Sequence, residues 1–437
     1  RHMAGLGARR AAMDVLGLIR EGYPMDAALI SCRTFNALEG PDRAFARNLV
    51  STVQRQRGAL DEVTGKYLDR PLPARAAEIV DILRLAAAQS LFLKTPDHAV
   101  VSTATELAAQ KRELEGYKGV VNAIARKVAV AGPAVLEKLP ARINTPGWLW
   151  RSWERIYGAQ KTKAIALAHG LEAPLDLSLK PSVDGPALLE EMRAAGMDGQ
   201  VLANGTLRLT GAKRIEDLPR YADGDWWAQD LAASLPVALF GDIADKDIAD
   251  ICAAPGGKTM QLAAAGANVV AVDRAPKRMA RVTENLARTK LTAEILIKDA
   301  LNWEPEGQFD GVLLDAPCSA TGTLRRNPDV AWAKTEDDLK GLHVLQAKFI
   351  DKALTLLKPG GTLIYCTCSL QRSEGEDQIT AALARHPGLR SVPIEPAQIG
   401  ALTEVISPKG FLRALPSHLS DQGGMDGFFA AKLTLTQ

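Results

Sequence analysis

The sequence predicts a multidomain protein with an all-α N-terminal domain, a small α+β connecting subdomain and a C-terminal α/β domain built on a doubly wound, mostly parallel sheet. Over residues 7–130, apolar side chains recur at helical spacing and strand-like alternation is nearly absent. From residue 236 onward, strand-like runs alternate with helical ones, as expected for strands joined by crossover helices. We therefore expect domains at residues 1–139, 140–233 and 234–437.

The N-terminal domain is expected to consist of consecutive amphipathic helices, separated by prolines and glycines that end helices or form turns. Helical spacing is found at residues 11–19, 43–57, 76–93, 99–110 and 117–129. Residues 1–140 contain 20 Lys and Arg against 15 Asp and Glu. This mildly basic balance permits contact with nucleic acid but does not require it.

The connecting subdomain combines helical and strand-like stretches, and the C-terminal domain alternates them. In the connecting subdomain, helices are expected at residues 148–157 and 162–169, and strands near 175–179 and 207–209. In the C-terminal domain, strands are expected at 248–252, 269–272, 295–297, 311–314 and 362–366, and helices at 258–265, 278–289 and 339–356. Ligands of such sheets bind at the carboxyl ends of the parallel strands.

The composition excludes several classes of protein. The 437 residues include five cysteines and six histidines and carry a formal net charge of +2. The odd, irregularly spaced cysteines do not form a disulfide framework, and no Cys-x-x-Cys or His-x-Glu pattern predicts a metal site. We find no stretch as long as a membrane span, and Arg1-His2-Met3 does not begin a signal peptide. We expect a cytoplasmic monomer with reduced thiols and without metal or membrane.

A glycine turn follows the first strand of the C-terminal domain, in the segment Asp250-Ile251-Cys252-Ala253-Ala254-Pro255-Gly256-Gly257-Lys258-Thr259. Strand, turn and helix in this order bind nucleotides in open α/β sheets. The turn lacks the Gly-x-Gly-x-x-Gly of a dinucleotide site, which disfavours a small-molecule oxidoreductase. Cys252 stands where a phosphate-binding P-loop requires glycine. S-adenosylmethionine remains as the cofactor, since it needs no phosphate cradle.

Three acids occur along successive strands of this domain, namely Asp250, Asp273 and Asp299. Asp273 is placed to bind the ribose hydroxyls of the cofactor, and Asp299 to accept a hydrogen bond from the adenine amine. Taken singly, each acid is more typical of a helix cap or a turn. The ordered set is what a methyltransferase sheet requires.

Two cysteine segments follow later strands: Asp315-Ala316-Pro317-Cys318-Ser319 and Tyr365-Cys366-Thr367-Cys368-Ser369. A thiolate that adds to carbon 6 of cytosine makes carbon 5 nucleophilic toward a methyl donor, so a cysteine beside such a donor has a definite chemical role. Asp315 would stabilise the charge that develops at N3 during this addition. Position alone does not rank Cys318 and Cys368.

The segments APGGKT, DAPCSATG and TCS resemble those of the Sun family of RNA 5-methylcytosine methyltransferases. The helical N-terminal region resembles the antitermination factor NusB, and the domain order is similar to that of family members that methylate small-subunit ribosomal RNA. The resemblance covers nearly the whole chain. It implies an RRM-like connecting subdomain and a Rossmann-like catalytic domain.

The resemblance also implies roles for individual residues. Cys368 is the implied nucleophile, and Cys318 is implied to assist release of the methylated RNA. The implied cofactor-binding residues are Ala254, Pro255, Gly256, Gly257, Lys258, Asp273, Arg278, Asp299 and Asp315. Arg325 and Arg326 lie in a segment that resembles the substrate-facing loop of the family, where they would bind RNA phosphates unless they form a solvated charge pair.

The other cysteines and acids near the motifs are given structural roles. Cys32, Cys252 and Cys366 are expected to pack as small apolar residues. Glu374 and Glu376 are expected to begin a helix.

The sequence thus predicts an S-adenosylmethionine-dependent RNA (cytosine-5)-methyltransferase that acts on ribosomal RNA through a covalent cysteine–carbon 6 intermediate. The target base must be flipped or unpaired, because a duplex buries its ring face. One alternative is the same chemistry on transfer RNA. Another is a non-catalytic NusB-like RNA-binding assembly factor, which the presence of Cys318, Cys368 and Asp315 disfavours.

Overall fold

The computed structural model describes residues 5–436, so Arg1-His2-Met3 lies outside the described residues. Contacts divide the chain into two compact units. The first comprises the residues up to Leu171 together with Leu324–Lys334, and the second comprises Glu172–Thr323 together with the residues from Thr335 onward. Residues 140–171 thus group with the N-terminal helices, and the three-domain division at 139 and 233 stays a prediction.

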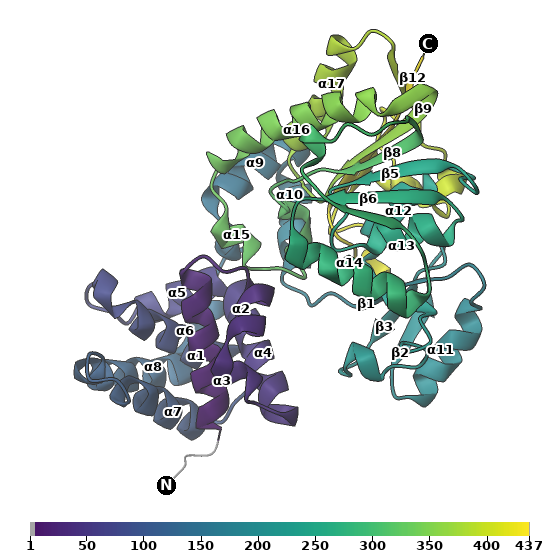
Figure 1. Cartoon of the computed structure of the whole chain (residues 1–437). Coiled ribbons are helices and arrows are strands. Elements are labelled where there is room, and N and C mark those ends of the chain that lie inside the picture. The colour runs from purple at the N-terminus through teal and green to yellow at the C-terminus, as the bar shows by residue number, and fades with distance from the viewer. Residues whose placement is uncertain (1–4, 437) are drawn as a thin grey trace. The chain divides into compact units, whose positions relative to one another are not determined.

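The first unit is helical, as the apolar spacing predicted (Figure 1). Its main core contains Leu49, Leu60, Ile79, Ile82 and Leu107, all nearly inaccessible to solvent. The expected helices are present, and the short α2, α3 and α5 were not expected. The helices are α1 (Leu6–Arg20), α2 (Met25–Ser31), α3 (Arg33–Asn36), α4 (Gly40–Arg55), α5 (Arg57–Gly65), α6 (Ala77–Leu91), α7 (Asp97–Ala109), α8 (Lys118–Leu136), α9 (Gly147–Tyr157), α10 (Ala159–His169) and α15 (Val330–Ala333).

One helical stretch corrects an expectation from the sequence. Glu115–Leu136, which contains α8, is long and apolar enough to cross a membrane by length and composition alone. The expectation that no stretch approaches this length was therefore wrong. The apolar face of α8 carries Val121, Ile124, Ala125 and Val128, which are buried in the helical core. A core helix passes the same test, so we attach no membrane role to this stretch.

Residues 324–334 leave the loop after Cys318 and fold with the helical unit. The carboxylate of Asp329 accepts a hydrogen bond from the Met25 backbone N–H at 3.0 Å, and Arg55 donates to the Arg325 carbonyl at 2.8 Å. The Arg57 guanidinium lies 5.0 Å from the centre of the Trp332 ring. A segment that continues the loop after Cys318 is thus part of the helical unit.

The second unit begins with a small antiparallel sheet of order β2-β3-β1-β4. Its strands are β1 (Leu175–Leu179), β2 (Asp198–Val201), β3 (Leu207–Thr210) and β4 (Trp226–Ala228), and α11 (Gly185–Ala194) follows β1. Leu188 and Met192 of α11 pack with Leu177, Leu207 and Trp226 in one core. This confirms the two expected strands and adds β2 and β4.

The large sheet has the order β10-β12-β9-β8-β5-β6-β7, and β11 pairs with β12. Five neighbouring strands, in the order β7-β6-β5-β8-β9, run parallel to one another. β12 is antiparallel to both β9 and β10. The strands are β5 (Asp247–Ile251), β6 (Asn268–Asp273), β7 (Glu294–Ile297), β8 (Phe309–Asp315), β9 (Leu357–Thr367), β10 (Leu389–Val392), β11 (Leu412–Ala414) and β12 (Phe428–Leu435). The predicted doubly wound sheet is confirmed, and β10–β12 were not expected.

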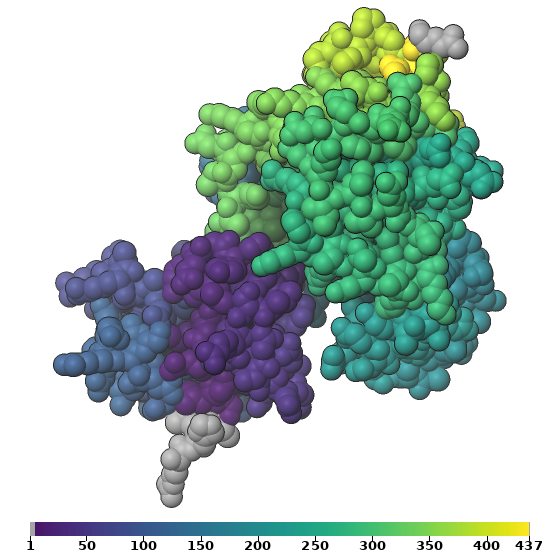
Figure 2. All heavy atoms as spheres, viewed as in Figure 1, coloured from purple at the N-terminus to yellow at the C-terminus, as the bar shows by residue number. Residues whose placement is uncertain are grey.

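Helices cover both faces of the large sheet (Figure 1). The core on one face includes α16 and α17, and the core on the other includes α12 and α13. Most residues of β12 are buried, and few atoms of this strand are visible on the face shown in Figure 2. The helices are α12 (Leu231–Ala238), α13 (Gly257–Ala264), α14 (Pro276–Thr289), α16 (Asp338–Thr355) and α17 (Glu376–Arg385).

Candidate active site

Two cysteine sulfur atoms meet at the carboxyl ends of neighbouring parallel strands. Cys318 follows β8 and Cys368 follows β9, and Asp315 of β8 is in register with Cys366 of β9. The sulfur atoms of Cys318 and Cys368 are 3.6 Å apart, and both residues are partly exposed. The two cysteines that the sequence placed after separate strands therefore form one site.

The two thiols differ in their surroundings. The hydrogen bond with Cys368, followed by burial, raises the pKa of the Cys318 thiol well above its ordinary value. Cys318 therefore keeps its proton at neutral pH and can donate it toward Cys368. A protonated thiol of this kind can donate a hydrogen bond to a neighbouring sulfur atom.

A lysine and an aspartate lie beside the thiols. The Lys258 ammonium donates to the Asp315 carboxylate at 2.9 Å, and the Cys366 thiol lies 3.7 Å from the other Asp315 oxygen. Burial by itself lowers the pKa of Lys258, but attraction to Asp315, Cys366 and Cys368 outweighs it, so the pKa is raised and the ammonium stays charged. The site therefore keeps a fixed positive charge next to the carboxylate expected at cytosine N3.

The remaining cysteines pack as expected from the sequence. Cys32 is buried in the helical core, Cys252 packs against one face of the large sheet and Cys366 is buried on the other. Burial is the main reason that the pKa values of Cys252 and Cys366 are raised well above the ordinary value. Neither thiol is a candidate nucleophile.

Glu374 bonds both cysteine segments, a position that the sequence did not reveal. It ends the short turn η7 (Arg372–Glu374) and is completely buried, whereas α17 begins at Glu376. The Glu374 carboxylate accepts hydrogen bonds from the Ser319 backbone N–H at 2.9 Å, the Ser319 hydroxyl at 2.5 Å, the Ser369 hydroxyl at 2.6 Å and Gln346 at 2.9 Å. The expectation that Glu374 begins a helix was wrong, because its side chain bonds both cysteine segments.

Glycines bring the backbone of these segments into direct contact. The Gly322 N–H donates to the Cys368 carbonyl at 2.9 Å, and the Gly427 N–H donates to the Gly322 carbonyl at 2.8 Å. A Cβ atom at Gly322 would lie 2.1 Å from the Gly427 carbonyl oxygen. Only glycine fits at position 322, so the loop after Cys318 is held against the strand end that carries Cys368.

The cofactor turn lies along the same edge of the sheet. Cys252 and Gly256 take the left-handed backbone conformation, with φ of 61° and 104°. The Asp273 carboxylate accepts hydrogen bonds from the Ala254 N–H at 3.2 Å and the Ala275 N–H at 3.0 Å, and Arg278 donates to the Ala254 carbonyl at 3.0 Å. Through these hydrogen bonds, Asp273 and Arg278 fix the backbone conformation of the turn.

The other two acids of the ordered set have different surroundings. Asp299 is partly exposed, and its carboxylate accepts a hydrogen bond from the Leu301 N–H at 3.0 Å, so it caps a short 3-10 turn. Asp250 is 1% exposed and accepts a hydrogen bond from Thr259 at 2.5 Å. Asp250 is therefore buried beneath the surface and bonds the helix that follows the turn through Thr259.

These residues fit S-adenosylmethionine better than a phosphate-bearing cofactor. Beside the turn, the carboxyl ends of β6, β7 and β8 place the carboxylates of Asp273, Asp299 and Asp315, which favour hydroxyl, amine and sulfonium groups and repel phosphates. In the described part of the chain, residues 5–436, no group of three or more His, Cys, Asp or Glu is arranged to hold a metal ion. Bound here, S-adenosylmethionine would supply an electrophilic methyl group.

Burial raises the pKa of Asp250 from 3.8 to about 7. The folded protein then holds this proton more tightly than the unfolded chain, so the contribution of Asp250 to stability is fully present below about pH 4 and is lost as the pH rises through 7. The difference corresponds to about 4 kcal/mol in the free energy of unfolding. We expect Asp250→Asn to reduce the dependence of the free energy of unfolding on pH. Urea unfolding of the wild type and the variant at pH 5 and pH 8 measures this dependence. Equal slopes would contradict the assignment.

The two arginines after the catalytic loop are placed differently. Arg325 is 2% exposed, so its side chain is not available to RNA phosphates in this structure, and that part of the prediction was wrong. The reason is that residues 324–334 fold with the helical unit, which the sequence pattern does not indicate. Arg326 is exposed, and its contact with RNA stays a prediction.

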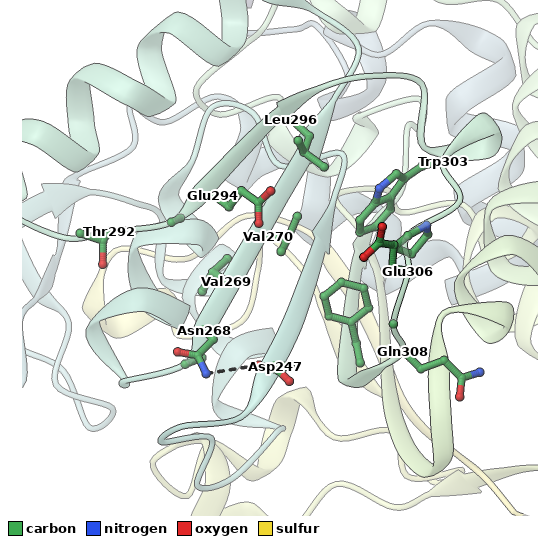
Figure 3. Close-up of a pocket in the computed structure, with 15 residues that line it drawn as sticks. Asp247, Asn268, Val269, Val270, Thr292, Glu294, Leu296, Trp303, Glu306 and Gln308 are labelled. Carbon is green, nitrogen blue, oxygen red and sulfur yellow. Dashed lines mark hydrogen bonds between the residues drawn. The ribbon is translucent and has the colours of Figure 1, made fainter.

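A wide cavity of about 690 Å³ lies away from the cysteines (Figure 3). It is formed at the amino ends of β5, β6, β7 and β8 and includes Asp247, Asn268, Glu294, Trp303 and Glu306. No Lys or Arg is among its lining residues. Its acidic lining and its place at the opposite end of the strands exclude it as the site of methyl transfer to RNA.

The fold and the cysteine site define a class of protein, the S-adenosylmethionine-dependent RNA methyltransferases. The profile of the family described as 16S rRNA methyltransferase RsmB/F matches residues 240–434, and that of the NusB family matches residues 7–130. The chain is 33% identical to ribosomal RNA small subunit methyltransferase B of Shewanella oneidensis over 97% of both chains, and 33% identical to the Vibrio cholerae protein of the same name over 98% of both. The chain belongs to the RsmB/F family.

Solved structures agree with this fold. The crystal structure of PH0851 matches 99% of both chains with a TM-score of 0.80 at 22% identity. A methyltransferase homolog protein from Pyrococcus horikoshii matches 65% of this chain and 93% of its own, with a TM-score of 0.55 at 27% identity. NSun6 from Pyrococcus horikoshii, crystallised with SFG, has a TM-score of 0.58 at 18% identity and covers 67% of this chain and 98% of its own. The likenesses at 22% and 18% identity show the fold alone.

Proposed function

We propose that this protein methylates carbon 5 of a cytidine in 16S ribosomal RNA through a covalent bond between Cys368 and carbon 6 of the base. The observation that carries the proposal is the pair of sulfur atoms 3.6 Å apart, beside the Lys258–Asp315 pair at the cofactor edge of the sheet. A single reactive cysteine would serve many reactions. Two adjacent cysteines beside a carboxylate suit addition to a pyrimidine ring followed by elimination.

In the proposed reaction, the Cys368 thiolate forms a bond to carbon 6, and a proton shared between the Asp315 carboxyl group and N3 neutralises the negative charge that develops on the ring. Carbon 5 then takes the methyl group, and a base removes the carbon 5 proton. The electron pair of that C–H bond restores the ring double bond as the sulfur–carbon 6 bond breaks. Cys318, which keeps its proton, assists this release by donating to the departing Cys368 thiolate.

The proposal also covers the RNA substrate, the location of the protein in the cell and its oligomeric state. The helical N-terminal unit would contact the RNA outside the target base, together with Arg326. Transfer RNA is the alternative substrate. We further propose that the protein works as a cytoplasmic monomer without a metal ion, with functional domains at residues 1–139, 140–233 and 234–437.

Bisulfite sequencing of total RNA tests the proposal. A strain that lacks the gene should lose one 5-methylcytosine in 16S RNA, the wild-type gene should restore it, and the gene for Cys368→Ala should not. A loss that appears in transfer RNA instead would support the alternative substrate. An unchanged set of 5-methylcytosines would overturn the proposal.

A further inference from the structure

The two cysteines are chemically identical, but the charges around them are not. The Cys318 segment is bound to an anion, because Ser319 directs both its N–H and its hydroxyl to the Glu374 carboxylate. Ser369, in the other segment, directs only its hydroxyl to Glu374. The Glu374 carboxylate therefore accepts two hydrogen bonds from the segment that carries Cys318 and one from the segment that carries Cys368.

Positive charge is placed on the Cys368 side. Arg413 donates to the Ser369 carbonyl at 2.6 Å, and its guanidinium also pairs with Glu376. The Lys258 ammonium interacts electrostatically with Cys368 as well as with Asp315. A thiolate is favoured where cations are near and disfavoured where an anion is near. This unequal distribution of charge favours ionisation of the Cys368 thiol over that of Cys318. The positions of the two cysteines in the sequence did not distinguish them.

The ionisation of Cys318 agrees with this geometry. After the hydrogen bond to Cys368 and burial, repulsion by the Cys368 and Glu374 charges contributes to raising the pKa of the Cys318 thiol. Tyr365 donates to the Glu374 backbone carbonyl at 2.6 Å, and burial keeps its hydroxyl neutral by raising its pKa. Glu374 is thus the acidic side chain of this buried network, and it forms two hydrogen bonds with Ser319 and one with Ser369.

We propose that Glu374 is a positioning residue that assigns the roles of the two cysteines. Its carboxylate holds the segments at one spacing through Ser319 and Ser369, and because it bonds Ser319 twice, its charge disfavours a thiolate at Cys318 more than at Cys368. The inference deepens the proposed function and rests on it. The ordering of the two thiols, however, is a property of the free protein and needs neither RNA nor cofactor.

Alkylation of the full-length protein by iodoacetamide at pH 8, followed by peptide mass spectrometry, tests the proposal. In the wild type, Cys368 should react faster than Cys318. Glu374→Gln removes the charge while nearly preserving the shape, and the ratio of the two rates should fall about tenfold. Asp377→Asn, an exposed acid three residues away, is the matched control and should leave the ratio unchanged.

A wild-type ratio in a Glu374→Gln protein with a wild-type circular dichroism spectrum would overturn the proposal. If Glu374→Gln does not fold, Ser319→Ala provides the second test, because it removes one of the bonds between Glu374 and the Cys318 segment. It should lower the ratio in the same direction, and an unchanged ratio would again overturn the proposal. Failure of the proposed function is distinguishable, because Cys368→Ala would then still methylate RNA whatever the alkylation ratio.

Discussion

Cys368→Ala should abolish methyl transfer, with a loss of more than about 10³-fold in kcat, because it removes the thiol that forms the bond to carbon 6. Cys318→Ala should instead let the bond form and slow its release, so that a protein–RNA adduct accumulates and survives a denaturing gel. The measurement is the release of tritium-labelled methyl groups into RNA, run beside such a gel. The two variants should thus fail at different steps.

The control for this pair is Cys32→Ala, which removes a buried cysteine of the helical core. It should methylate RNA at the wild-type rate and leave no adduct. The opposite pattern, with an adduct for Cys368→Ala and none for Cys318→Ala, would exchange the two roles. An adduct for neither variant, with activity retained in both, would show that no cysteine bonds the base.

Asp176→Ala should lower the free energy of unfolding of the second unit by about 3–5 kcal/mol, because it leaves the buried Arg208 guanidinium without its carboxylate. Asp176 and Arg208 are 4% and 2% exposed, and they form two hydrogen bonds of 2.8 and 2.9 Å. Burial lowers the pKa of Arg208, but Asp176 and its neighbours outweigh this and raise it, so the guanidinium stays charged. Urea unfolding followed by near-ultraviolet circular dichroism measures the change.

Two further variants separate the ion pair from its surroundings. Asp176→Leu combined with Arg208→Met replaces both charges by apolar groups and should recover much of the loss, whereas Asp176→Ala alone should not. Arg193→Ala removes an exposed arginine that pairs with Glu190 and Asp198 in the same subdomain, and should cause no measurable change. Equal effects of Asp176→Ala and Arg193→Ala would show that burial does not make the Asp176–Arg208 pair important.

The Asp176–Arg208 pair also connects the small sheet to the active site. Arg208 donates to the Gln422 carbonyl at 3.0 Å and to the Gly424 carbonyl at 2.5 Å. This loop leads to Gly427, whose N–H bonds Gly322 in the catalytic loop. We therefore expect the connecting subdomain to contribute to the geometry of the cysteines as well as to the stability of the unit.

Periodicity in the sequence predicted the helices and the parallel strands to within a few residues. β12 was missed although Phe428–Leu435 is largely apolar, because an apolar run of this length does not by itself distinguish a strand from a buried helix. Its place between β9 and β10 depends on pairing with residues some 40 to 70 positions earlier, such as Ala431 with Tyr365. Long-range pairing of this kind is not present in local spacing.

The sequence predicted the positions of some motif residues correctly and misjudged others. Asp273, Asp315, Cys318 and Cys368 lie at the carboxyl ends of strands, where their positions after apolar runs had placed them. Glu374 and Arg325 were misjudged, because burial decides what each does. A charged residue in a turn looks exposed in the sequence, and only the surrounding segments show that it is covered.

By itself, the sequence determined which segments form helices and strands, which cofactor the glycine turn can accept and which thiols carry the chemistry. These properties depend on residues a few positions apart, and short motifs contain all of them. Only the tertiary structure decided that the two sulfur atoms lie 3.6 Å apart, that the buried Glu374 carboxylate bonds both cysteine segments and that residues 324–334 belong to the helical unit. Those outcomes depend on the order of strands in the sheet and on burial, since both arise from contacts between distant parts of the chain.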